Sequence, residues 1–236
     1  MKKLINVIFF KIIKINVLAK FLLRTALKTH NISYQVSGIL STSLEPNKIH
    51  PKHRLMRYHD WFASNLNHDW HVLDIGCGNG ALDYKIKPYC RSITAIDIDK
   101  YNIKNAKDRF SREGIIYICA DALTYENYEK NDAIILSNVL EHIEKRIEFL
   151  KRIYEWQNQK RPPILLLRVP MITRDWISMY KKEFGVEWRL DHSHYTEYSL
   201  EQVFDELSRA GLEIESYNVQ YGEFYGIAKK ASDSDQ

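Results

Sequence analysis

The stretch that decides the fold is VLDIGCGNG, residues 72–80. Residues 71–75 form a short apolar run, and the glycines at 76, 78 and 80 follow it directly. An apolar run closed by glycines predicts a buried strand that ends in a tight turn, because glycine adopts the positive φ angles that such turns require. In an open α/β sheet, ligands bind at the carboxyl ends of the strands. We therefore expect residues 72–80 to border a binding site.

Four further apolar runs are short enough to be strands, and stretches of helical periodicity separate them. The runs lie at residues 92–97, 115–119, 133–136 and 164–169. The helical stretches lie near residues 51–66, 80–87, 100–113, 141–159 and 200–210. Continuous apolar strands that alternate with helices predict a parallel sheet covered on both faces. Residues 213–229 predict two last strands, which a tight turn at Gly222 makes antiparallel.

Composition excludes several classes of protein. The chain has 236 residues, of which 45% are hydrophobic and 27% are charged, and these values are typical of a globular protein. Its three cysteines, Cys77, Cys90 and Cys119, contain no CxxC pair. A disulfide framework and a cysteine-built zinc site are therefore excluded, and a reducing, cytoplasmic location is favoured.

Positive charge gathers at the N-terminus. Residues 1–44 hold 7 of the 34 basic residues and none of the 30 acidic ones, although the whole chain has a net charge of +4. The remaining residues therefore carry more acids than bases. A nucleic-acid-binding domain would carry its positive charge on the folded body, so we expect no nucleic-acid partner.

Residues 1–28 predict a basic amphipathic helix. Its apolar face consists of Leu4, Ile5, Ile8, Ile12, Ile15, Ala19, Leu22, Leu23 and Ala26. Lys11 and Lys14 interrupt the stretch that would otherwise span a membrane. Two interpretations remain open: peripheral contact with an anionic membrane at its inner face, and packing on the chain's own domain. We expect an extension and linker at 1–50, irregular from residue 29, a domain at 51–230 and a frayed C-terminus at 231–236.

Acidic residues at the strand ends indicate the ligand. Residues 76–81 satisfy the loose dinucleotide fingerprint, so a nicotinamide dinucleotide has to be considered. However, Asp74 stands beside the glycine turn, where a carboxylate opposes a pyrophosphate and suits a ligand with an ammonium group. Asp97, at the end of the next strand, can accept hydrogen bonds from ribose hydroxyls, and Asp121 can accept one from an adenine amino group.

In these motifs the chain resembles the class I S-adenosylmethionine-dependent methyltransferases, and among them the small-molecule group. The resemblance covers about residues 70–229 and rests on VLDIGCGNG at 72–80, AIDID at 95–99, ADA at 120–122 and SNVLEHI at 137–143. It implies an α/β, Rossmann-like sheet of seven strands, mostly parallel with the last strand antiparallel, behind an N-terminal helical extension. It also implies S-adenosylmethionine as the cofactor.

The resemblance implies a role for each matching residue. The cofactor-binding residues would be Asp74, Gly76, Cys77, Gly78, Gly80, Asp97, Ile98, Asp121, Ala122 and Ser137. Those of the glycine turn would line the methionine end of the cofactor. Asp97 would bind the ribose, Ile98 would pack on the adenine, and Asp121 and Ala122 would position the adenine. Ser137 would face the sulfonium.

Two histidines are candidates for catalysis. Methyl transfer from a sulfonium is an in-line displacement, and a general base assists it when the acceptor is a hydroxyl. His142 follows the fourth strand, and His194 lies in an aromatic insertion at 171–196. Packing for His142 and a surface position for His194 are the alternatives. Asp191, His192 and His194 also resemble a metal-binding set, but they are too few, and we expect no metal.

The expected function is therefore methyl transfer to a small-molecule, sugar or lipid-linked acceptor, with oxygen as the methylated atom. The alternative is a non-catalytic binding or membrane-docking module of the same fold, which predicts an eroded cofactor loop. The intact Asp74, glycines and Asp97 speak against that alternative. A nicotinamide-dependent oxidoreductase is a third, weaker hypothesis.

Overall fold

The computed structural model describes residues 16–46, 49–126, 131–155 and 162–231. Contacts divide the chain into two compact units. The first, which we call the helical unit, contains residues 1–55 and 175–188, and the second, the sheet unit, contains residues 56–174 and 189–236. Residues 175–188 of the aromatic insertion pack with the N-terminal helix in the helical unit.

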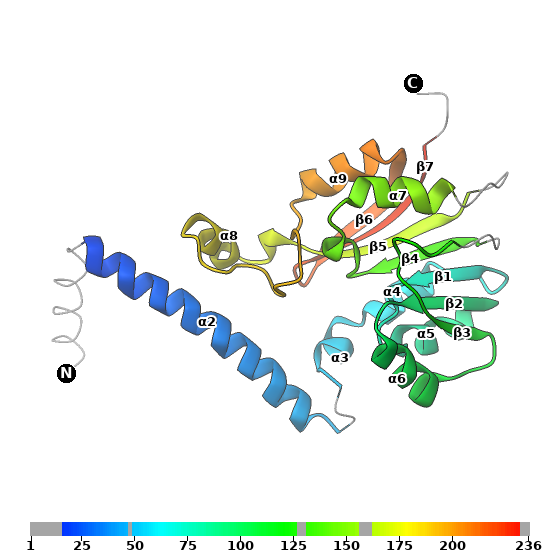
Figure 1. Ribbon diagram of the computed structural model, residues 1–236, viewed down its shortest axis with the longest axis horizontal. Coiled ribbons are helices and arrows are strands. Elements are labelled where there is room, and N and C mark those ends of the chain that lie inside the picture. Colours follow the sequence, from blue (N-terminus) through cyan, green and yellow to red (C-terminus); the bar gives the residue numbers. More distant parts are fainter. Residues whose placement is uncertain (1–15, 47–48, 127–130, 156–161, 232–236) are drawn as a thin grey trace. The chain divides into compact units, whose positions relative to one another are not determined.

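The sheet unit is built on one seven-stranded sheet (Figure 1). In chain order its strands are β1 (His71–Ile75), β2 (Ser92–Asp97), β3 (Ile115–Cys119), β4 (Ala133–Ser137), β5 (Ile164–Pro170), β6 (Leu212–Gln220) and β7 (Glu223–Lys230). Their order in space is β3-β2-β1-β4-β5-β7-β6. The first five are parallel, and β7 pairs antiparallel with both β5 and β6. The predicted seven-stranded sheet with an antiparallel last strand is confirmed.

Helices cover both faces of this sheet (Figure 1). One face is covered by α4 (Tyr58–Ser64), α5 (Ala81–Ile86) and α6 (Lys100–Phe110), and the other by α7 (Arg146–Glu155) and α9 (Leu200–Arg209). Short helical turns complete the unit at η1 (Lys87–Tyr89), η2 (Leu140–His142) and η3 (Ile172–Arg174). The strand order reverses between β1 and β4, and this is the position where open α/β sheets bind their ligands.

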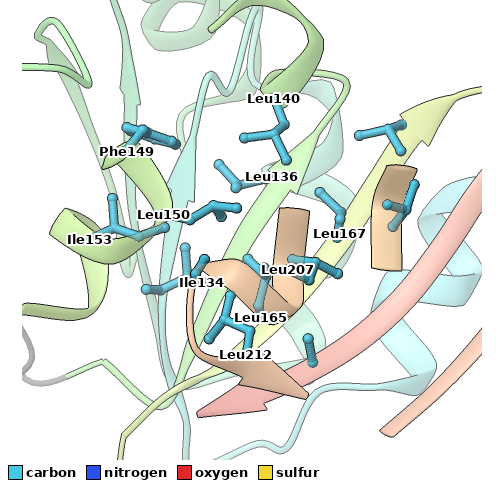
Figure 2. Packing of buried hydrophobic residues seen from close by; sticks show 14 of the residues in the cluster. Ile134, Leu136, Leu140, Phe149, Leu150, Ile153, Leu165, Leu167, Leu207 and Leu212 are labelled. Atoms are coloured by element: carbon cyan, nitrogen blue, oxygen red, sulfur yellow. The ribbon is translucent and has the colours of Figure 1, made fainter. Parts of the chain in front are cut away.

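Side chains that alternate along the buried strands pack into two separate cores, one on each face of the sheet. Figure 2 shows the core on the α7 and α9 face, where the labelled residues are Ile134, Leu136, Leu140, Phe149, Leu150, Ile153, Leu165, Leu167, Leu207 and Leu212. On the opposite face, Phe62 of α4 and Ile86 of α5 pack with Val72 and Ile135. Because side chains alternate along a strand, a strand buried on both faces has to be apolar throughout, which explains the continuous apolar runs.

The helical unit consists of α2 (Asn16–Leu44), most of α3 (Lys52–Met56) and α8 (Trp176–Glu183). Asn31 of α2 donates to the carbonyl of Glu187, and Lys181 of α8 donates to Asn31 Oδ1 at 2.7 Å. The N-terminal part of the predicted amphipathic helix, residues 1–15, lies outside the described residues, as do residues 232–236 of the predicted frayed end.

Two expectations about this region are wrong. Residues 29–44 are helical, not an irregular linker, because the hydroxyls of Ser41 and Thr42 bond back to the carbonyl of Gly38 and polar residues are thereby accommodated within the helix. The single helix predicted at residues 51–66 is two helices, α3 and α4. Arg57 between them has a left-handed backbone with φ of +50°, which interrupts the helical path.

The glycine turn generates a prediction about stability. Gly80 has φ of +80°, and a Cβ there would lie 2.6 Å from the Tyr117 hydroxyl and 2.9 Å from the Cβ of Ala106. Gly78 also has positive φ, +56°, but a Cβ there meets nothing within 4 Å. Gly80→Ala therefore combines backbone strain with overpacking, and we expect it to lower the free energy of unfolding by about 2–4 kcal/mol.

Gly78→Ala is the matched control, since it introduces the backbone strain alone and should cost only about 1 kcal/mol. Urea denaturation of both variants measures the difference. An equal loss of free energy of unfolding in the two variants would show that the contacts around Gly80 do not exclude a side chain there.

Candidate functional site

A pocket of about 420 Å³ lies at the carboxyl ends of the parallel strands. Its lining residues are Gly76, Ile96, Asp97, Ile98, Ala120, Asp121, Ala122, Leu123, Asn138, Val139, His142 and Ile143. They lie at or just after the carboxyl ends of β1, β2, β3 and β4, so one site contains residues of all four motifs that the sequence singled out. The volume lies within the range of about 300–1,000 Å³ that is usual for small-molecule sites.

The glycine turn forms one wall of the pocket because its backbone is tied to the next strand. Gly76 N and Cys77 N both donate to the carbonyl of Ile96, at 2.7 and 3.0 Å. Gly76 has φ of +75°, and a Cβ there would lie 2.4 Å from Cγ2 of Val139. Only glycine therefore allows the end of β1 to come this close to the residues that follow β4.

Asp97 is the polar centre of the wall. Its Oδ2 accepts a hydrogen bond from Gly78 N at 2.9 Å, and its Oδ1 accepts from Asp99 N at 2.8 Å and from Asn102 Nδ2 at 3.3 Å. These donors fix the orientation of the carboxylate, which still has acceptor capacity, since a carboxylate offers about four lone-pair sites. Asp99 itself caps α6, because its Oδ1 accepts from Tyr101 N at 2.7 Å.

The residues beyond Asp97 offer an apolar surface beside an acid. Ile98 is 70% exposed and lines the pocket, so its apolar side chain is accessible to a ligand bound there. Asp121 accepts a hydrogen bond from Leu123 N at 2.8 Å through Oδ1. A flat apolar ring that carries an amino group fits this combination, because the ring can cover Ile98 while the amino group donates to a carboxylate.

The predicted residues do not all line this pocket. Those that do are Gly76, Asp97, Ile98, Asp121, Ala122 and His142. The other predicted residues, namely Asp74, Cys77, Gly78, Gly80, Ser137 and His194, are outside the lining set. Ser137 instead accepts a hydrogen bond from the guanidinium of Arg168 at 3.2 Å.

Asp74 is one half of a buried acid pair that the sequence did not reveal. Asp74 is 1% exposed, Asp83 of α5 is fully buried, and neither carboxyl has a hydrogen-bond donor among the described residues. Burial raises the pKa of both carboxyls, and each interacts with the other. Two carboxylates are acceptors only, so a proton held between them supplies the missing donor. The sequence offered one sign that Asp83 is buried, because it lies between Leu82 and Ile86, which are on the buried side of a short helix.

The two predicted histidines lie together at the edge of the pocket. The rings of His142 and His194 are 4.6 Å apart between centroids and nearly perpendicular. His142 Nδ1 is 3.0 Å from Ser193 Oγ, and Tyr195 N donates to the Glu141 carbonyl at 2.8 Å, so the loop that carries His194 is tied to η2. Burial and the neighbouring His194 lower the pKa of His142, so the neutral form of its imidazole is favoured.

Glu141 is a further group that sequence reasoning missed. It is fully buried, and neither of its side-chain oxygens has a hydrogen-bond partner among the described residues. Burial raises the pKa of Glu141 to about 8. Its position next to the candidate base His142 was the only hint in the sequence. The burial of Glu141 depends on how η2 packs, and the sequence does not reveal that packing.

The acid pair generates a prediction about pH. Burial raises the pKa of Asp74 to about 7, well above its value of about 3.9 in an unfolded chain. The folded protein therefore holds a proton that the unfolded chain has released, so the contribution of this pair to stability is greatest at low pH and falls as pH rises through neutrality. In Asp83→Asn the amide can donate to Asp74. We therefore expect the free energy of unfolding to fall less between about pH 5 and pH 8 than it does in the unmodified chain.

Urea denaturation at both pH values measures this difference, and Asp108→Asn, at an exposed acid of α6, is the control. An unchanged pH dependence in Asp83→Asn would contradict the shared proton.

Known proteins resemble the part of the chain that forms the pocket. The family described as "Methyltransferase domain" matches residues 73–158, which run from β1 to just beyond α7. An uncharacterised methyltransferase of Mycobacterium bovis is 35% identical over 83 residues, which are 35% of this chain and 42% of the relative. The ubiquinone biosynthesis O-methyltransferase of Caulobacter vibrioides is 32% identical over 84 residues, 34% of this chain and 33% of the relative. The chain thus spans less than half the length of these relatives.

Solved structures share the fold over a longer stretch. The N-methyltransferase NodS from Bradyrhizobium japonicum, in complex with S-adenosyl-L-homocysteine, superposes with a TM-score of 0.57 and 17% identity. That similarity covers 75% of this chain and 87% of NodS. The strand order, the antiparallel β7 and the glycine turn after β1 are the features of a methyltransferase sheet. Residues 73–158 of the sheet unit thus match a methyltransferase domain, and the unit shares its fold with S-adenosylmethionine-dependent methyltransferases.

Proposed function

We propose that the sheet unit transfers a methyl group from S-adenosylmethionine to a hydroxyl of a small-molecule, sugar or lipid-linked acceptor. The observation that carries the proposal is the fixed carboxylate of Asp97. It lies in the pocket between the glycine turn and the acid that follows β3, and its hydrogen bonds to Gly78 N and Asp99 N orient it before any ligand arrives.

The residues of the pocket fit the parts of this cofactor. Asp97 would accept from the ribose, and Ile98 would lie against the adenine. Asp121 and Ala122 would take the adenine edge. The bound cofactor supplies an activated methyl group on a positively charged sulfur. The protein has to orient the acceptor, exclude water and assist the loss of a proton from the hydroxyl.

The electrostatics of the site favour this cofactor over a nicotinamide dinucleotide. Asp97 and Asp121 line the pocket, and the buried Asp74 and Asp83 lie behind the glycine turn that follows β1. A cationic ligand without phosphate is attracted to such a site, whereas a pyrophosphate is repelled. We propose that the amino-acid end of S-adenosylmethionine, with its ammonium group, binds on the side of the glycine turn that carries Asp74, Cys77, Gly80 and Ser137.

Two observations favour oxygen as the methylated atom and argue against a non-catalytic module. His142 lines the pocket with His194 beside it, and imidazoles at this position can assist the loss of a hydroxyl proton. The glycine turn has also kept the three positive φ angles on which it depends. A module without catalytic function would have no need to hold Asp97 and the histidines at one pocket.

We also propose that the N-terminal region binds an anionic membrane surface. Val17 and Phe21, one turn apart on α2, are 79% and 66% exposed, and Lys20 lies beside them. An apolar stripe flanked by cations suits the boundary between lipid headgroups and acyl chains. Among the described residues, no helix has both the length and the hydropathy to cross a bilayer.

Titration with S-adenosylhomocysteine tests the cofactor. We expect binding to the whole chain and a loss of about 30-fold or more in Asp97→Ala, because charge-assisted hydrogen bonds to the ribose are removed. Asp99→Ala is the matched control, since it removes a neighbouring acid that caps α6 and should change the affinity by less than about threefold.

Isothermal calorimetry measures both affinities, with NADH as the competing ligand. Absence of binding to the unmodified chain, equal affinities in Asp97→Ala, or tighter binding of NADH would each overturn the assignment.

Co-sedimentation with vesicles tests the membrane surface. The whole chain should sediment with vesicles that contain phosphatidylserine and less with neutral ones, and added salt should weaken the binding. Phe21→Ser should reduce binding by about tenfold, since one large apolar side chain is lost from the lipid. Tyr101→Ser on α6, 67% exposed, is the control and should have no effect. Equal sedimentation with neutral vesicles, or no effect of Phe21→Ser, would contradict the proposal.

A further inference from the structure

Three side chains of metal-binding type converge beside the pocket. Each of Glu141, His142 and His194 offers one oxygen or nitrogen atom, and these atoms lie within 4.8 Å of one another. Glu141 and His142 come from η2 after β4, whereas His194 comes from the loop between α8 and α9, 52 residues further along than His142. The hydrogen bond from Tyr195 N to the Glu141 carbonyl holds the two segments together.

The carboxylate of Glu141 is the first independent sign of a missing ligand. Glu141 is fully buried, and both of its side-chain oxygens lack a hydrogen-bond partner among the described residues. A buried polar group without a partner is costly, so native structures satisfy nearly all of them. An ion bound between this carboxylate and the two imidazoles would satisfy Glu141.

The contacts of the two histidines are the second sign. His194 Nδ1 is 3.3 Å from Oε1 of Glu197, and His142 Nδ1 is 3.0 Å from Ser193 Oγ. Ser193 Oγ in turn donates to Asp191 at 2.7 Å. With each Nδ1 occupied by an outer partner, Nε2 is the atom that remains for a ligand. Histidines that bind metals are oriented in this way, through a carboxylate or hydroxyl on the other nitrogen.

The donor set selects the class of metal. Two imidazole nitrogens and one carboxylate oxygen suit Zn²⁺, Mn²⁺ or Fe²⁺, whereas Mg²⁺ and Ca²⁺ prefer oxygen alone. Three protein ligands leave at least one coordination position open, as in catalytic rather than structural sites. Since His142 also lines the pocket, the open position is available to a molecule bound there.

We propose that Glu141, His142 and His194 bind a divalent transition-metal ion that holds the oxygen of the methyl acceptor. This inference rests on the proposed function and refines it, because it states how the histidines assist the reaction. Bound to the ion, the acceptor hydroxyl has a lowered pKa and loses its proton to solvent. The acceptor oxygen then forms a bond to the methyl carbon while the carbon–sulfur bond breaks. The electron pair of the broken bond stays on sulfur, which becomes a neutral thioether.

Equilibrium dialysis followed by elemental analysis tests the site. The metal-depleted whole chain is dialysed separately against Zn²⁺, Mn²⁺ and Mg²⁺. We expect about one Zn²⁺ or Mn²⁺ per chain, and weaker Mg²⁺ binding. Glu141→Gln and His194→Ala should weaken binding by at least about tenfold, and Ser193→Ala should weaken it by a smaller factor.

His192→Ala is the matched control, because it removes a histidine from the same loop but not from the cluster. S-adenosylhomocysteine titration of the same samples serves as the second measurement. The metal site is overturned if no stoichiometric Zn²⁺ or Mn²⁺ binds, if Glu141→Gln and His194→Ala bind as tightly as the unmodified chain, or if His192→Ala loses the ion equally. If the metal site is overturned but S-adenosylhomocysteine still binds, the proposed function stands. If the metal binds but S-adenosylhomocysteine does not, the proposed function is overturned and the metal site stands.

Discussion

The hydrogen bond between Gly78 N and the carboxylate of Asp97 is the interaction on which the site depends. It joins the turn after β1 to the end of β2, and it does so through an acid that is itself a candidate ligand for the ribose. Three glycines with positive φ allow the turn to approach, and the Asp99 backbone fixes the other oxygen of Asp97. The polar wall of the pocket is therefore organised by the fold before a ligand binds, which is the arrangement that favours affinity and catalysis.

Buried acids are the second feature that unites the site. Asp74 and Asp83 lie in the core near the glycine turn, and Glu141 lies beside the histidine pair. Burial raises the pKa of all three, because a charge without a partner is disfavoured in the interior. Such groups lower stability, and a site retains them when a cation or a proton satisfies them. An ammonium or sulfonium group, and a metal ion next to Glu141, are cations of the kind that this edge of the sheet can accommodate.

Much of the fold followed from the sequence, and part of the site did not. The apolar runs predicted all five parallel strands, and Asp97, Ile98 and Asp121 line the pocket as expected because strand ends meet at one edge of a sheet. Residues 29–44 were expected to be irregular and are helical, because the hydroxyls of Ser41 and Thr42 bond to the Gly38 carbonyl within the helix. Asp83, Glu141 and Glu197 were missed because burial and a meeting of distant segments are tertiary properties, which no local spacing reveals.

A crystal structure of the chain soaked with S-adenosylhomocysteine and NAD together tests whether Asp97 binds the ribose of an adenosyl ligand. We expect electron density for the adenosine moiety with its ribose hydroxyls on Asp97, its adenine against Ile98, and its amino-acid end beside the glycine turn. A pyrophosphate lying across residues 76–80, or a nucleoside bound with Asp97 pointing away from its ribose, would contradict it.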